Sequence, residues 1–189
     1  MWPGSPNRTV VAVTGESDEL PAADVFVGTE AVLHRVRNID VIAFLDFDAE
    51  LLAPRYRSAE QAMALLVRAG RLVGARDRGG RVIVQTYVPH HEVLQAALLG
   101  DTGRLVDGEL ARRRLLGLPP FRALAALEGA DAESVAVATR LEYAKTAKGV
   151  LVRGDDWLTL GRALAQAAGA KGPRAKGSRL RIAVDPQRV

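Results

Sequence analysis

The sequence predicts an α/β protein in two parts, a parallel α/β unit followed by a smaller unit in which strands and helices alternate. Two observations carry this prediction. Four short, β-branched apolar runs are bounded by turn residues, at 8–15, 23–29, 41–48 and 81–87. Their apolar character is continuous rather than alternating, which is typical of strands covered on both faces in a parallel sheet.

The second observation is a helical pattern between the last two runs. In residues 57–76, apolar side chains recur at helical spacing, at Ala59, Met63, Leu66 and Val67. Ser58 and Gln61 have the spacing of a capping box at the start of this helix. Strand, helix and returning strand predict a βαβ crossover, with residues 77–80 forming the turn into the last strand.

The pattern changes after this unit. Helical spacing continues to Gly117 and the pair Pro119–Pro120, which predicts a domain boundary and divides the chain into 1–90, a helical linker 91–118, and 119–189. The last domain predicts strands at 121–130, 149–154 and 178–186. Its helices are predicted at 131–147, opened by Asp131, and at 155–169, capped by Asp155 or Asp156. This order predicts a split-βαβ, ferredoxin-like domain that is one strand short.

Composition excludes several classes of protein. The chain has no cysteine, so it forms no disulfide and no cysteine-ligated metal site, and its three histidines are too scattered to form a metal site. No apolar run approaches the roughly 20 residues that span a bilayer, and the N-terminal sequence lacks the features of a signal peptide. These observations predict a cytoplasmic protein without a membrane segment.

The basic charge is concentrated near the C-terminus. Residues 170–181 contain five basic residues and no acid, beside glycine and proline. Such a stripe predicts either a loop that contacts phosphates or a solvated surface loop. The candidate nucleic-acid contacts are Lys171, Arg174, Lys176 and Arg179, followed by Arg112, Arg113 and Arg114. The three consecutive arginines also lie at a predicted helix end, where cations complement the helix dipole.

Two acidic and two histidine side chains are of the types that bind metals. Asp46 and Asp48 are two residues apart at the end of a predicted strand, so they are expected to share a face that suits Mg²⁺. Capping of the next turn by such an acid is the commoner arrangement. His90 and His91 are expected to be helix-entry residues. We therefore predict no metal site and no catalytic residue.

Several segments resemble the primosomal protein N′ family, the superfamily-2 helicases that restart stalled replication forks, in the divergent form of actinobacteria. Residues 25–66 resemble the stretch from helicase motif V towards motif VI, and residues 80–98 resemble the strand and helix that follow motif VI. The sequence "ELARRRLLGLPPF" resembles the start of the family's C-terminal domain, and "RIAVDPQ" resembles its terminal strand. The resemblance implies that the first unit is part of a RecA-like second helicase lobe.

The same resemblance implies that the motor motifs are degenerate. Typical members read Q-x-x-G-R-A-G-R in motif VI, where the central arginine contacts the γ-phosphate. Here Ala69 takes the place of the glutamine and Val73 that of the central arginine; Arg68, Arg71 and Arg76 remain, with Arg71 about 200° away around the helix. Motif V is altered as well, since "VLHRVRN" replaces the family's "KGHDF".

No phosphate-binding loop or acidic motor motif is present in this sequence. The resemblance implies that ATP and zinc are bound by segments absent here, as in a C-terminal fragment, and that this chain alone does not hydrolyse ATP.

Three functions are therefore open. The first is DNA binding, to forked or single-stranded DNA, in a replication-restart protein. The second is a non-enzymatic scaffold that docks primosome or single-strand-binding proteins. The third is a module for RNA or small molecules, although an RNA-binding sheet needs exposed aromatic residues, which the predicted strands 149–154 and 178–186 lack.

Overall fold

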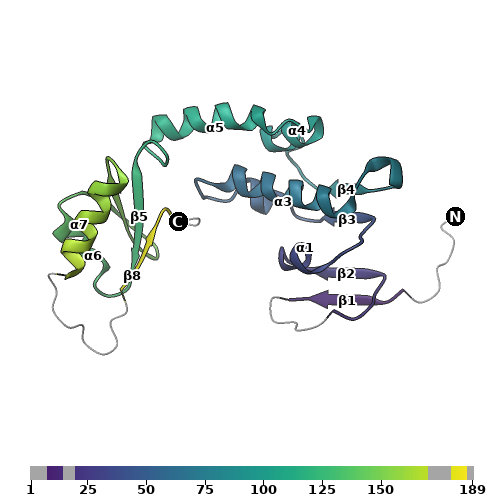
Figure 1. Cartoon of the computed structure of the whole chain (residues 1–189), viewed down its shortest axis with the longest axis horizontal. Coiled ribbons are helices and arrows are strands. Elements are labelled where there is room, and N and C mark those ends of the chain that lie inside the picture. Colours follow the sequence, from purple (N-terminus) through teal and green to yellow (C-terminus); the bar gives the residue numbers. More distant parts are fainter. Residues whose placement is uncertain (1–7, 15–19, 170–179, 187–189) are drawn as a thin grey trace. The chain divides into compact units, whose positions relative to one another are not determined.

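The computed structural model describes residues 8–14, 20–169 and 180–186, apart from the side chain of Arg76 (Figure 1). The described chain is a mixed α/β protein, as predicted. It divides into two units. The first comprises the chain up to Ala53 together with Ser58–Thr102, and the second comprises Pro54–Arg57 together with the chain from Gly103 onward.

The first unit contains two pairs of parallel strands. Strand β1 (Val10–Val13) pairs with β2 (Val25–Gly28), and β3 (Val41–Phe44) pairs with β4 (Arg81–Val84). All four predicted strands are therefore present, and each is shorter than its apolar run. The two pairs are separate two-stranded sheets rather than one continuous sheet.

The helices of the first unit connect and cover these strands. They are α1 (Ala31–Arg35), α2 (Asp48–Leu51), α3 (Ser58–Val73), the 3-10 turn η1 (Arg76–Arg78) and α4 (Glu92–Leu99). The longest, α3, is the predicted crossover between β3 and β4 and begins at Ser58, as predicted. Its buried side includes Ala62, Met63, Leu66 and Ala69.

The second unit contains one four-stranded antiparallel sheet in the order β6-β7-β5-β8. Its elements along the chain are α5 (Gly103–Leu116), β5 (Ala123–Glu128), α6 (Ala132–Thr139), β6 (Glu142–Thr146), β7 (Gly149–Gly154), α7 (Trp157–Gly169) and β8 (Arg181–Val184). Helices α6 and α7 pack on the sheet and on each other. The core between them includes Leu127, Val135, Val152, Leu160 and Leu164.

Strand β6 corrects the sequence prediction, which placed residues 131–147 in one helix. Helix α6 ends at Thr139 because Arg140 adopts a left-handed conformation with φ 58°. The chain then returns as β6, which pairs with β7 along five residues. All five residues of β6 are exposed, and none of them has to be apolar to fill a core. The sequence therefore shows no apolar strand pattern there, and the strand is recognised only by its pairing with β7.

The segment 91–118, predicted as a helical linker, contains α4 and α5. Helix α4 belongs to the first unit and α5 to the second, and the linker itself stays a prediction. Helix α5 ends before Gly117, whose φ of 58° is the left-handed conformation that glycine adopts readily at a helix C-terminus. The amide of Leu118 donates to the carbonyl of Arg113 at 2.9 Å, which closes the last turn.

None of the helices in the described part of the chain is both long enough and apolar enough to cross a membrane.

Candidate functional site

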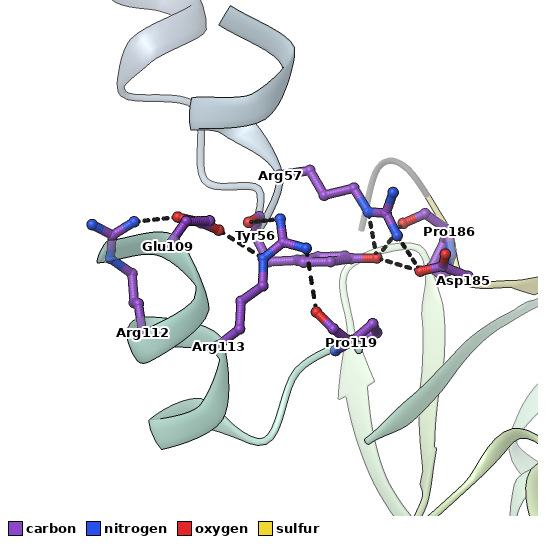
Figure 2. A network of polar contacts seen from close by, with 8 residues as sticks. All are labelled: Tyr56, Arg57, Glu109, Arg112, Arg113, Pro119, Asp185 and Pro186. Carbon is purple, nitrogen blue, oxygen red and sulfur yellow. Dashed lines mark hydrogen bonds and ion pairs between the residues drawn. The ribbon is translucent and has the colours of Figure 1, made fainter. Parts of the chain in front are cut away.

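The main polar cluster of the second unit surrounds Tyr56 and Arg113 (Figure 2). Arg113 was predicted as a nucleic-acid contact, but it lies on α5 with only 4% of its surface exposed. Its Nε donates to Glu109 Oε1 at 2.8 Å, and its Nη1 donates to the carbonyl of Pro119 at 3.2 Å. Glu109 is equally buried, at 5% exposure. Its guanidinium is therefore held by Glu109 and the Pro119 carbonyl, and its contact with nucleic acid stays a prediction.

Tyr56 connects α5 to the end of β8. Its single hydroxyl hydrogen is shared between Asp185 Oδ1 at 2.9 Å and the carbonyl of Pro186 at 3.0 Å, and its oxygen accepts a hydrogen bond from Arg57 Nε at 2.9 Å. The Tyr56 carbonyl accepts from Arg113 Nη2 at 3.5 Å. The guanidiniums of Arg57 and Arg113 lie 5.2 and 5.4 Å from the ring centroid, within the range of cation–π attraction.

The ion pair between Arg57 and Asp185 completes the cluster, which we call the Tyr56 network: Tyr56, Arg57, Glu109, Arg113 and Asp185. Burial raises the pKa of the Tyr56 hydroxyl. Burial alone lowers the pKa of Arg57, but its hydrogen bonds to Asp185 and Tyr56 outweigh this effect and the pKa lies above its usual value. Tyr56 is therefore a neutral donor and Arg57 a permanent cation near neutral pH.

The two arginines beside Arg113 are more accessible. Arg112 forms an ion pair with Glu109, and 47% of its side chain is exposed. Arg114 stacks over the ring of Phe121, with 4.5 Å between its guanidinium and the ring centroid. Both remain candidate DNA contacts. The four predicted contacts in the basic segment, Lys171, Arg174, Lys176 and Arg179, lie outside the described residues.

A pocket of about 540 Å³ opens beside the Tyr56 network. It is lined by Arg57, Arg113, Pro119, Pro120, Trp157, Val184 and Asp185, all of which belong to the second unit. Trp157 is the first residue of α7 and is 41% exposed. The pocket thus combines apolar walls with two guanidiniums and a carboxylate.

The arginines of the predicted motif VI lie on or just after α3. Arg68 donates from Nε to the carbonyl of Leu33 at 2.8 Å, so it ties α3 to α1. Arg71 is exposed in the last turn of the helix. Arg76 begins the turn η1 after the helix has ended, and its side chain lies outside the described part of the structure. Ala69, in the place of the family's glutamine, is fully buried.

Asp46 and Asp48 do not lie on one strand face, because β3 ends at Phe44 and Asp48 begins α2. The carboxylate of Asp48 accepts hydrogen bonds from the Thr86 hydroxyl and, at 2.8 Å, from the Tyr87 amide. It therefore caps the turn after β4, the neighbouring strand, rather than the turn that follows its own strand. Within the described residues, no group of three histidine or acidic side chains is placed to hold a metal ion.

His91 caps α4 through its Nδ1, which accepts from the Val93 amide at 3.3 Å, as expected of a helix-entry residue. Asp156 caps α7 in the same way, since its Oδ1 accepts from the Thr159 amide at 2.8 Å. Of the two aspartates that the sequence offered as caps, the structure therefore selects Asp156.

The pKa of Asp48 is lowered, mainly by the hydrogen bond from the Thr86 hydroxyl and next by the hydrogen bond from the Tyr87 amide. The charge of His91 lowers it further. A carboxyl group whose pKa is lowered by folding stabilises the fold above its unfolded pKa, and this contribution is lost as the pH falls through the folded pKa. We expect Thr86→Val to raise the pKa of Asp48 towards its ordinary value, as measured by carboxyl carbon-13 NMR. An Asp48 pKa unchanged by this substitution would contradict the assigned cause.

Sequence reasoning missed Tyr56, Arg57 and Asp185 as members of one cluster. Tyr56 and Asp185 are separated by 129 positions. The only signal was the position of "PRYR" between two helical patterns, and a local pattern does not show that this segment packs against the last strand.

Comparison with known proteins adds evidence of relationship. No family model matches the chain. Replication restart protein PriA of Bacillus subtilis is 32% identical over 105 residues, which are 54% of this chain and 13% of that protein. PriA of Thermotoga maritima is 34% identical over 105 residues, 53% of this chain and 14% of that protein.

A third PriA, from Synechocystis, is 32% identical over 101 residues, 52% of this chain and 12% of that protein. About half of this chain is similar to PriA. The resemblance to a replication-restart family is therefore confirmed over that half. The chain spans only about an eighth of the length of these PriA proteins.

Proposed function

We propose that this chain is the C-terminal portion of a PriA-like replication-restart protein, and that it binds forked or single-stranded DNA. The similarity to PriA over about half of the chain is the observation that carries this proposal. In the proposal the motor motifs are degenerate, and the chain alone binds neither ATP nor zinc and does not hydrolyse ATP. It acts in the cytoplasm, and primosome or single-strand-binding proteins are candidate partners.

The elements within each unit support a finer description of the fold. The first unit contains a βαβ crossover with parallel pairing, which fits part of a RecA-like second lobe. From β5 to β8 the second unit has the order β-α-β-β-α-β, which is the order of a split-βαβ module. We assign these two classes as part of the same proposal.

The proposed DNA contact is electrostatic. The segment 170–181 carries five basic residues, and the whole chain has a net charge of +4. Contacts of lysine and arginine with phosphates do not depend on base sequence and weaken steeply as salt is added. Arg112 and Arg114 on α5 are the secondary contacts of this proposal.

Replacing Lys171, Arg174, Lys176 and Arg179 together by alanine tests the proposal. If each of these four side chains neutralises one phosphate, each contributes roughly −0.7 to the slope of log affinity against log salt on single strands, and roughly −0.9 on duplex. We expect the quadruple variant to bind every DNA sequence more weakly and to flatten the slope by about three units. Fluorescence anisotropy on forked DNA over a range of salt concentrations measures both quantities.

A matched control removes the same charge elsewhere in the second unit, by replacing the exposed residues Arg104, Lys145, Lys148 and Arg162 with alanine. This control should keep a salt slope close to that of the parent. A basic-segment variant that retains both the parent affinity and the parent slope would refute the proposed contact and favour the scaffold function.

A further inference from the structure

We propose that the pocket beside the Tyr56 network takes one unpaired base of single-stranded DNA, stacked on the indole of Trp157. The proposal rests on the proposed DNA binding and names a base-binding subsite within it. The pocket lies wholly in the second unit, and Figure 2 shows four of its lining residues, Arg57, Arg113, Pro119 and Asp185.

The lining chemistry fits a nucleobase, which has two apolar faces and a polar edge. Pro119, Pro120 and Val184 supply apolar walls, and Trp157 supplies an aromatic surface. Stacking on such a surface is available to every base, since each has a π face. A volume of about 540 Å³ lies within the range of roughly 300–1,000 Å³ that is usual for small-molecule sites.

The polar edge of a base meets two groups that are already held in place. Arg57 is fixed by its hydrogen bond to the Tyr56 hydroxyl and its ion pair with Asp185, so its guanidinium plane is set before a ligand arrives. The side chain of Asp185 is 40% exposed, which leaves surface for an amino group to approach. A donor and an acceptor on one wall suit the mixed hydrogen-bonding edge of a base.

The surroundings of Trp157 favour a base over a phosphate at this position. Asp155 and Asp156 immediately precede the indole, and Asp156 already caps the first turn of α7. These carboxylates repel an anion at the helix N-terminus. The exposed indole, rather than the helix dipole, is therefore the feature that recognises the ligand.

Trp157 also reports on its own site. The chain has two tryptophans, so in a Trp2→Phe background the fluorescence comes from Trp157 alone. The full chain is titrated with an oligodeoxythymidylate of about 12 nucleotides, within the range of site sizes known for single-strand binders. We expect quenching of Trp157 with the same midpoint as binding measured by anisotropy.

Trp157→Ala should weaken binding of this oligonucleotide by roughly 5- to 150-fold, the range that corresponds to one stacked base. Trp157→Phe, which retains an aromatic ring, should recover part of the loss. Leu158→Ala is the matched control, because Leu158 is the next residue on α7, is 61% exposed and does not line the pocket. It should bind as the parent does.

The outcomes separate this inference from the proposed function. Binding by anisotropy without a change in Trp157 fluorescence, and with Trp157→Ala as tight as the parent, would overturn the base pocket and leave DNA binding intact. If an apolar peptide quenched the fluorescence of Trp157 and the oligonucleotide did not, the pocket would be assigned to a protein partner. That result would also overturn the base pocket. No DNA binding by the parent would refute the proposed function itself.

Discussion

Glu109→Ala is expected to destabilise the second unit by about 3–5 kcal/mol, the cost of leaving one partner of a buried ion pair uncompensated. The remaining partner, Arg113, is 4% exposed and cannot turn its guanidinium to solvent without leaving its place in the network. The carbonyls of Pro119 and Tyr56 also accept hydrogen bonds from its guanidinium, and as neutral groups they do not balance its charge.

Urea unfolding followed through Trp157 fluorescence, in the Trp2→Phe background, measures this loss within the second unit. The double variant Glu109→Leu/Arg113→Met removes both charges and should recover most of the stability, because well-packed apolar side chains replace a buried pair at little cost.

Glu142→Ala is the exposed counterpart, since Glu142 pairs with Arg122 and Arg153 at the surface. Its expected cost is much smaller, because exposed ion pairs contribute little to stability. A Glu109→Ala variant as stable as Glu142→Ala would contradict the buried pair.

Tyr56→Ala should destabilise the second unit by about 2–4 kcal/mol, slightly less than the usual cost for a fully buried aromatic residue because Tyr56 is only partly buried. The substitution removes the ring that the guanidiniums of Arg57 and Arg113 both approach, and the hydroxyl that bonds Asp185. Tyr56→Phe keeps the ring and loses only the hydrogen bonds, so about 1 kcal/mol is expected.

Amide hydrogen exchange shows where the Tyr56 substitution acts. The amide of Asp185 donates to the carbonyl of Leu124 at 2.9 Å, at the end where Tyr56 contacts β8. We expect this amide to exchange faster in Tyr56→Ala than in Tyr56→Phe, whereas β6 on the opposite edge of the sheet should change little. Equal stability and equal exchange in the two variants would show that the ring does not anchor the strand.

Local patterns accounted for the elements whose signal lies in consecutive residues. The apolar runs predicted strands β1 to β4, and the spacing at Ala59, Met63 and Leu66 predicted α3. In these elements apolar residues follow one another in the pattern of a buried strand or a helix, so a short stretch of sequence shows the element. The C-terminal glycine and proline signals placed the end of α5 correctly. The resemblance to a replication-restart family also came from the order of short segments, and it is confirmed over half of the chain.

The sequence failed where an element or residue depends on distant partners. Strand β6 is exposed along its whole length and exists because β7 offers it a hydrogen-bonding edge. Arg113 looked like one of three surface arginines, yet the tertiary structure buries it beside Glu109 and a segment more than 50 positions earlier in the chain.

By itself the sequence determined the α/β class, most of the elements and the family to which half of the chain is similar. Only the tertiary structure decided that residues 54–57 pack with the last strand, which of three consecutive arginines is buried, and that Trp157 lines a pocket beside them. The physical reason is that secondary structure follows from the spacing of apolar residues within about ten positions. A polar network instead depends on donors and acceptors that the fold brings together from 128 positions apart.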